Sequence, residues 1–195
     1  MNVPLRAVPL VLGLFVLLLA GCSLRPQNIK LDPPVEVSPS SVGQGKIVWV
    51  QIRDLRVRKT LGNVGDPEGK FTQISVDDDF SLTVYQRLSA AMRKLGFAPQ
   101  PTPGPDGRQL VVEVTELKYQ SLKKTLTFAT EASVSLTAKA TNGTDHYDRV
   151  YNAGEQRTSA LMPDERERAE MVNRIVGMAL EDMLNDPRMV AVLTQ

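Results

Sequence analysis

The chain has 195 residues, with 23 lysines and arginines, 22 aspartates and glutamates, and a formal net charge of +1 at pH 7. This balance gives no electrostatic reason to expect nucleic acid or an anionic membrane face as a partner, because such binders carry a marked excess of lysine and arginine. We therefore expect no nucleic-acid partner.

The first twenty-two residues form the sharpest motif. An early cation, Arg6, precedes an apolar run over residues 8–19, which ends in Leu19, Ala20, Gly21 and Cys22. The run is shorter than the roughly 20 residues that a helix needs to cross a bilayer, but it fits the apolar region of a signal peptide. An uncleaved transmembrane anchor with an incidental cysteine is the alternative. The pattern resembles the signal peptide and lipobox of a bacterial lipoprotein.

This resemblance implies cleavage after Gly21, removal of residues 1–21 and acylation of Cys22, the only cysteine. A lone thiol in an oxidising compartment has no disulfide partner in the chain, which agrees with a lipid-carrying role. In lipoproteins of this kind an aspartate after the cysteine signals inner-membrane retention. Ser23 stands there instead, so we expect a lipid anchor at the periplasmic face of the outer membrane.

The next segment differs sharply in composition. Residues 22–45 are rich in proline, serine and glycine, which predicts a tether after the lipidated cysteine. Alternatively, the period-two spacing of apolar residues forms an edge strand at Ile29, Leu31, Val35 and Val37. Residues 46–195 are the right length for a single periplasmic domain.

Alternating apolar residues predict strands over 46–54, 71–76, 109–118 and 125–141. The last has the clearest alternation, which indicates one covered and one wet face. Asn142-Gly143 predicts a two-residue hairpin turn, in which facing positions sum to 285. This register pairs Ala138 with Tyr147 and turns Tyr147 and Tyr151 toward the covered face. A four-residue loop shifts the pairs but keeps that facing, whereas a three-residue loop turns Val150 inward.

Two amphipathic helices are predicted. The first follows Asp77, Asp78 and Asp79, runs over 80–95 and ends at Gly96; we expect the aspartates to cap it rather than to bind metal. The second opens at Pro163-Asp164 and stops at residues 185–187, with one further turn over 188–193. The predicted fold is α+β: an antiparallel sheet of about four to five strands, with the two main helices packed on one face in two layers.

The side-chain inventory argues against an enzyme. The only histidine, His146, is predicted to be exposed, and the sequence contains no GxSxG elbow, HExxH pair or phosphate-binding glycine loop. A catalytic carboxylate pair would require glutamates that converge in space, and the candidates are Glu113, Glu116 and Glu131. Solvation of the protein surface explains these residues better. We expect no catalytic residue, no metal site and no cofactor beyond the diacylglycerol and acyl groups on Cys22.

The order of these features resembles the YajG-like lipoproteins of Gram-negative bacteria. The lipobox at Cys22 comes first, followed by a proline segment with Leu31 and Pro33 and a strand leading into Asp54-Leu55-Arg56. A helix ending at Gly96-Phe97, a strand ending in residues 140–143 and a terminal helix complete the order. The resemblance implies envelope location and an α+β fold rather than a reaction.

Two functions remain open. The first is a non-catalytic accessory that docks on another envelope protein, through a sheet edge or a basic segment made of Arg53, Arg56, Arg58 and Lys59. The second is a binding module that holds a small ligand or a cell-wall or lipid fragment between the sheet and its helices. A filled core with an exposed apolar patch favours the first, and an apolar cavity favours the second.

Overall fold

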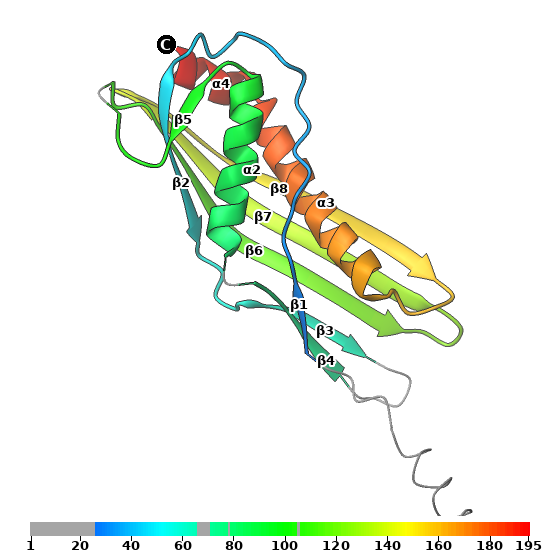
Figure 1. Ribbon diagram of the computed structural model, residues 1–195. Helices are drawn as coiled ribbons and strands as arrows, with labels where there is room; N and C mark the ends of the chain where they lie inside the picture. Colours follow the sequence, from blue (N-terminus) through cyan, green and yellow to red (C-terminus); the bar gives the residue numbers. More distant parts are fainter. Residues whose placement is uncertain (1–25, 66–70, 78, 105) are drawn as a thin grey trace, which may run out of the picture.

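The computed structural model describes residues 26–65, 71–77, 79–104 and 106–195 (Figure 1). The predicted signal peptide, its cleavage site at Gly21, the lipidation site Cys22 and the sorting residue Ser23 lie outside these residues. Among the described residues the strands are β1 Gln27–Ile29, β2 Ile47–Asp54, β3 Thr60–Gly65, β4 Phe71–Val76, β5 Ala98–Gln100, β6 Gln109–Lys123, β7 Phe128–Asn142 and β8 Asp145–Ser159. The helices are α2 Phe80–Lys94, α3 Glu165–Leu184 and α4 Pro187–Thr194.

These eight strands form one mixed sheet. The 15-residue strands β6, β7 and β8 are antiparallel to one another. On its other edge, β6 pairs in parallel with β2 along its first half and with β3 beside Ser121. Strand β5 adds in parallel to β2, β4 is antiparallel to β3, and β1 is parallel to β4.

The predicted antiparallel sheet of four to five strands in two layers is therefore wrong. Four of the seven strand pairings are parallel, and the sheet has eight strands. The chain passes through β3, β4 and α2 between β2 and its parallel partner β5, and a parallel pair requires such a crossover connection. Alternation reports which side of a strand is covered, but it carries no information about the direction of the neighbouring strand.

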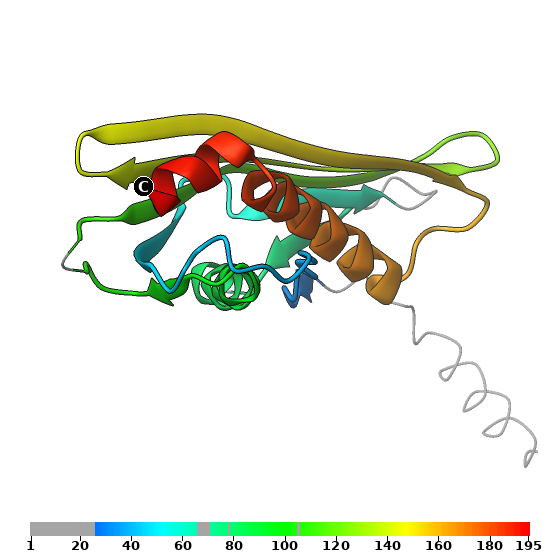
Figure 2. The same ribbon diagram turned by 90° about the horizontal axis from the view of Figure 1, so that it is seen from above.

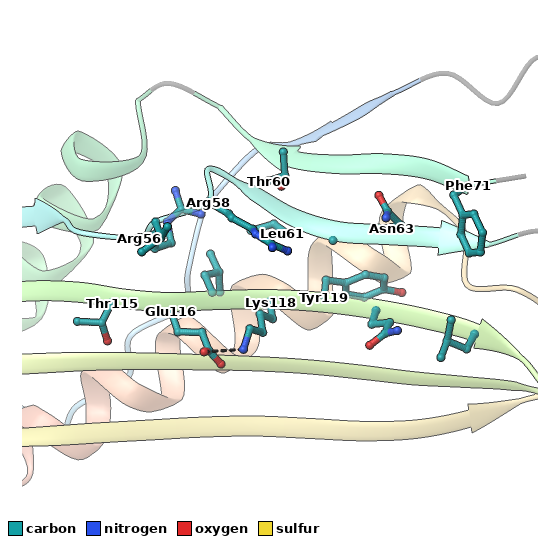
Figure 3. Close-up of a pocket in the computed structure, with 15 residues that line it drawn as sticks. Arg56, Arg58, Thr60, Leu61, Asn63, Phe71, Thr115, Glu116, Lys118 and Tyr119 are labelled. Atoms are coloured by element: carbon teal, nitrogen blue, oxygen red, sulfur yellow. Dashed lines mark hydrogen bonds and ion pairs between the residues drawn. The ribbon is translucent and has the colours of Figure 1, made fainter.

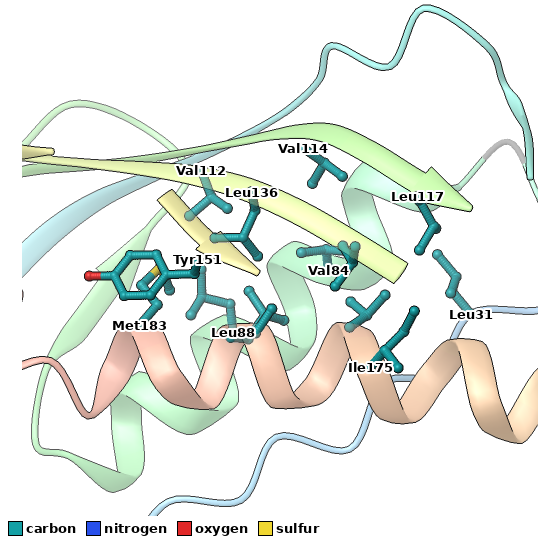
Figure 4. Close-up of a cluster of buried hydrophobic side chains, with 14 of the residues drawn as sticks. Leu31, Val84, Leu88, Val112, Val114, Leu117, Leu136, Tyr151, Ile175 and Met183 are labelled. Carbon is teal, nitrogen blue, oxygen red and sulfur yellow. The ribbon is translucent and has the colours of Figure 1, made fainter. Parts of the chain in front are cut away.

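The helices cover one side of the sheet, with α3 beside β7 and β8, and α2 beside β2 and β5 (Figure 2). Between the layers, buried side chains from both sides meet (Figure 4): Val112, Val114 and Leu136 from the sheet, and Val84, Leu88, Ile175 and Met183 from the helices. The alternative prediction was a ligand cavity between the sheet and the helices. These side chains fill that space.

The segment predicted as a tether lies on the body. Strand β1 is paired with β4, and both Ile29 and Leu31 are buried. Residues 30–37, here called the strap, cross α3: Asn173 Nδ2 donates to the Lys30 carbonyl at 3.3 Å, and the Asp32 N–H donates to Asn173 Oδ1 at 2.7 Å. The folded body therefore begins near Gln27 rather than at Lys46. Of the predicted edge strand at Ile29, Leu31, Val35 and Val37, only Ile29 has strand pairing.

The β7–β8 hairpin has a different register from the predicted one. Asn142 faces Asp145, so facing positions sum to 287 and Ala138 faces Arg149. The turn residues are Gly143 and Thr144, and only Gly143 has a positive φ, of 60°. Glycine at the first turn position is typical of a type II′ turn, whereas the prediction assumed type I′. The shift by two residues keeps Tyr151 on the covered face, where it is buried as predicted.

The helix boundaries agree with the prediction. Asp164 accepts from the Glu167 N–H and the Glu167 side chain accepts from the Asp164 N–H, which completes a capping box for α3. Helix α2 begins after Asp79, whose side chain makes no capping hydrogen bond, so the expected aspartate cap is wrong there. None of the helices in the described part of the chain has the length and apolar character needed to span a bilayer.

Candidate functional site

The candidate site is an open groove of about 590 Å³ between β3 and β6 (Figure 3). We call it the β3–β6 groove. Its lining includes Arg56, Arg58, Thr60, Asn63, Phe71, Thr115, Glu116, Lys118, Gln120 and Leu122. Lys118 and Gln120 are exposed and alternate with the buried Leu117 and Tyr119, so the groove opens on the side of the sheet away from the helices.

A gap in strand pairing creates the groove. The β2–β6 ladder ends at Asp54 opposite Val114, and pairing on this edge of β6 resumes at Val64 opposite Ser121. A bulge lies in β6 between Val114 and Glu116, and bulges bend a strand and interrupt its ladder. Residues 115–118 of β6 therefore border the groove without a ladder partner on this side.

Gly62 allows β3 to return to β6. Its φ is +156°, and a Cβ atom at this position would lie 2.1 Å from the Tyr119 carbonyl oxygen. A larger residue would push β3 away from β6, because main-chain atoms cannot approach so closely past a side chain. Gly62 therefore limits the width of the groove.

A buried ion pair closes one end of the groove. Arg56 donates to both Asp54 oxygens, with Nε–Oδ1 at 2.8 Å and Nη2–Oδ2 at 2.9 Å, and Lys59 Nζ lies 2.8 Å from Oδ2. The Arg56 side chain is 3% exposed, and its guanidinium lies 4.5 Å from the centre of the Phe80 ring. Burial raises the pKa of Asp54, but the hydrogen bonds from Arg56 and Lys59 outweigh it and lower the pKa from 3.8 to about 2.

Only two of the four predicted docking residues line the groove. Arg56 and Arg58 line the groove. Lys59 is bound to Asp54, and Arg53 contacts Glu113 at 3.5 Å, so neither belongs to the lining. The predicted continuous basic segment is thus split, because Asp54 and Glu113 neutralise part of it.

Sequence reasoning missed the other groove residues. Uninterrupted alternation would place Lys118 on the covered side, with Leu110 and Val112, and the bulge after Val114 moves it to the exposed side. Neither the bulge nor the pairing gap has a local sequence signal. Lys118 pairs with Glu116 at 2.6 Å, so the groove carries both signs of charge. Phe71 and Leu122 form its apolar end.

A second polar cluster, also missed, fixes α4 to the sheet. Asp186 is 5% exposed and accepts from Tyr151 Oη at 2.8 Å, Arg149 Nη1 at 2.9 Å, Tyr147 Oη at 3.1 Å and the Arg188 N–H at 2.9 Å. Burial raises its pKa, but these donors outweigh burial and lower it to about 2. Because Asp186 is also the N-cap of α4, this cluster has a structural explanation.

The described residues contain no group of three histidine, cysteine, aspartate or glutamate side chains placed to hold a metal ion. His146 is exposed beside the β7–β8 turn. Glu113 pairs with Lys139 at 2.7 Å, and Glu116 pairs with Lys118. The groove itself presents exposed side chains of both charges beside the edge of β6.

Comparison with known proteins places the fold and the family. The crystal structure of an uncharacterized protein has 11% identity and a TM-score of 0.51, over 80% of this chain and 96% of the other. Protein XCC0632 from Xanthomonas campestris has 12% identity and a TM-score of 0.51, over 86% and 95%. At such identities the likeness concerns the fold alone. No curated protein sequence matches this chain.

The family Lipoprotein_16, described as an uncharacterized lipoprotein, matches residues 33–194. This match covers every helix and all the strands except β1 in the described part of the chain. The chain therefore belongs to this YajG-like family of uncharacterized lipoproteins.

Proposed function

We propose that this lipoprotein is a non-catalytic docking protein of the cell envelope. It is anchored at the periplasmic face of the outer membrane. Through the β3–β6 groove it binds an extended segment of a partner protein. Membership of a lipoprotein family supports the anchor. The residues that provide it are Cys22, as the acylated residue, with cleavage after Gly21 and Ser23 as the sorting residue.

The observation that carries the docking role is the edge of β6 over residues 115–118, which has no ladder partner before β3 reaches Tyr119 at Gly62. An extended peptide can add to such an edge through main-chain hydrogen bonds, with pockets for its alternate side chains. Arg58 and Lys118 favour an acidic side chain in that peptide. The packed core between sheet and helices supports this role over the ligand-binding alternative.

Site-specific photo-crosslinking in intact cells tests the docking role. A benzoylphenylalanine residue is placed at Asn63 or Gln120 in the groove, or at the exposed His146 as a control. We expect one envelope protein to be captured at both groove positions and not at residue 146. Capture that is equal at all three positions would contradict the proposal.

Charge reversal supplies the matched control. R58E with K118E is expected to reduce the crosslink at least several-fold, because it removes both exposed cations of the groove. R93E with K94E makes the same change in charge at the exposed end of α2 and is expected to leave the crosslink unchanged.

The anchor has its own test. Mass spectrometry of the native protein is expected to show a chain that starts at an acylated Cys22. In gradient fractionation we expect it in the outer membrane, and S23D in the inner membrane. An intact first segment, residues 1–21, would contradict the anchor without affecting the docking test.

A further inference from the structure

The ends of β3 and β4, the β6–β7 connection, the end of β8 and the start of α3 lie at one end of the body (Figure 1). Large exposed apolar side chains occur in or beside these segments. We call Phe71, Leu122, Leu126 and Leu161 the tip surface. Leu126 precedes Phe128 by two residues, and Leu161 follows Ser159, the partner of Phe128, by two. Phe71 and Leu122 line the same end of the groove.

The side chains of the tip surface remain exposed in the folded body. Leu126 is 84% exposed and Leu161 is 80% exposed, and the other two are also exposed. Single exposed leucines are ordinary, but a cluster of large apolar side chains marks a site of contact with another surface.

The distance to the lipid anchor identifies that surface. Strand β1 begins beside Ile74, and Phe71 lies three residues away in β4, about 10 Å along the strand. Cys22 precedes Gln27 by five residues, and five residues span at most about 18 Å when fully extended. The early start of the folded body thus leaves little chain to separate it from a bilayer that holds Cys22.

We propose that the tip surface inserts into the headgroup region of the leaflet that holds the acylated Cys22. This inference rests on the acylation proposed above. Lys123 and Lys124 are exposed between the two leucines of the β6–β7 connection, and their stems can lie on apolar surface while their ammonium groups reach lipid phosphates. Asp164 and Glu165 follow Leu161, so apolar burial rather than net charge drives the contact.

Depth-dependent fluorescence quenching tests the insertion. The full-length acylated protein, with its only tryptophan removed as W49F, receives one new tryptophan as L126W, L161W or V150W. Val150 is the matched control because it is also exposed, at 52%, and lies opposite Thr137, nine residues along β7 from Phe128. The proteins are reconstituted into phosphatidylcholine vesicles with and without bromine on the acyl chains.

We expect brominated lipid to quench L126W and L161W at least two-fold more than V150W, with emission shifted to the blue. Twenty per cent phosphatidylglycerol is expected to change this little. Equal quenching at all three positions, with Cys22 shown to be acylated by mass spectrometry, would overturn the insertion and leave the anchor intact. An unacylated Cys22 would overturn both.

Discussion

Two carboxylates, the partly buried Asp54 and the buried Asp186, organise the polar contacts of this domain. Each is charged at neutral pH because several donors surround it. Asp54 fixes the connection that borders the groove through Arg56, and Asp186 fixes α4 to β8 through Tyr151. Their pKa values of about 2 mean that both stabilise the folded state above about pH 4.

Substitution of Arg56 is expected to destabilise the protein strongly. R56A leaves the Asp54 carboxylate without its two-point partner and removes the contact with Phe80, so we expect the free energy of unfolding to fall by about 2 to 3 kcal/mol. R58A changes an exposed arginine two residues away and is expected to change it by less than about 0.5 kcal/mol. Urea unfolding measures both, and equal effects would show that the buried pair contributes nothing.

The stabilising effect of Asp186 depends on pH. Because its pKa is lower in the folded state than the ordinary 3.8, its contribution of about 2 kcal/mol is present above pH 4 and is lost as the pH falls toward 2. D186N keeps a capping side chain but loses the charge. We expect it to lower the free energy of unfolding by about 2 kcal/mol at pH 7 and by about half as much at pH 3. D182N, at an exposed position, is the control. A loss of unfolding free energy in D186N that is the same at pH 7 and pH 3 would contradict this account.

At the scale of elements, the strap and α3 depend on each other. A Cβ atom at Gly177 would lie 1.9 Å from the Pro34 carbonyl oxygen, so the strap contacts the helix backbone itself. The Glu36 N–H donates to Glu181 Oε1 at 2.6 Å one turn further along. A glycine in the middle of a helix is intrinsically unfavourable, and here the close packing of the strap explains it.

G177A is therefore expected to reverse the usual effect of alanine in a helix. Alanine normally stabilises a helix by about 1 kcal/mol over glycine, but here it displaces the strap. We expect a lower free energy of unfolding and faster proteolytic cleavage within residues 30–37. M178A, at the exposed neighbouring position, is the control. Unchanged cleavage in G177A would show that the strap is not held by this contact.

At the scale of the whole molecule, the body extends over the family match and beyond it. Burial of Ile29 and Leu31 places β1 inside the cooperative unit, although both residues precede the first residue of the family match, Pro33. A body that begins at Gln27 also keeps the tip close to the lipidation site, whereas a free tether from 22 to 45 would separate them.

Truncation tests this boundary. A chain of residues 46–195 loses two buried aliphatic side chains, each worth about 1.5 to 3 kcal/mol, together with the cover over α3. We expect its urea midpoint to fall far below that of residues 26–195, because a domain of this kind has only about 5 to 15 kcal/mol of stability. Coincident unfolding curves for the two chains would show that residues 26–45 do not stabilise the folded body and act as a tether.

Local patterns predicted a good part of this protein. The alternation in 125–141 correctly assigns the buried and exposed faces of β7, and Asp164 with Glu167 marks the start of α3. These features depend on neighbours within a few residues, so they are visible in the order of side chains.

The mixed pairing, the strap and the groove depend on contacts between residues far apart in the chain. Strand β6 receives two parallel partners in tandem, and neither its own alternation nor theirs specifies which strand lies alongside or in which direction. Burial of Ile29 and Leu31 likewise requires a surface on β4 and α3 that exists only after folding. Side-chain order thus sets the covered faces and the helix ends, whereas competition among many segments for one apolar core selects their partners.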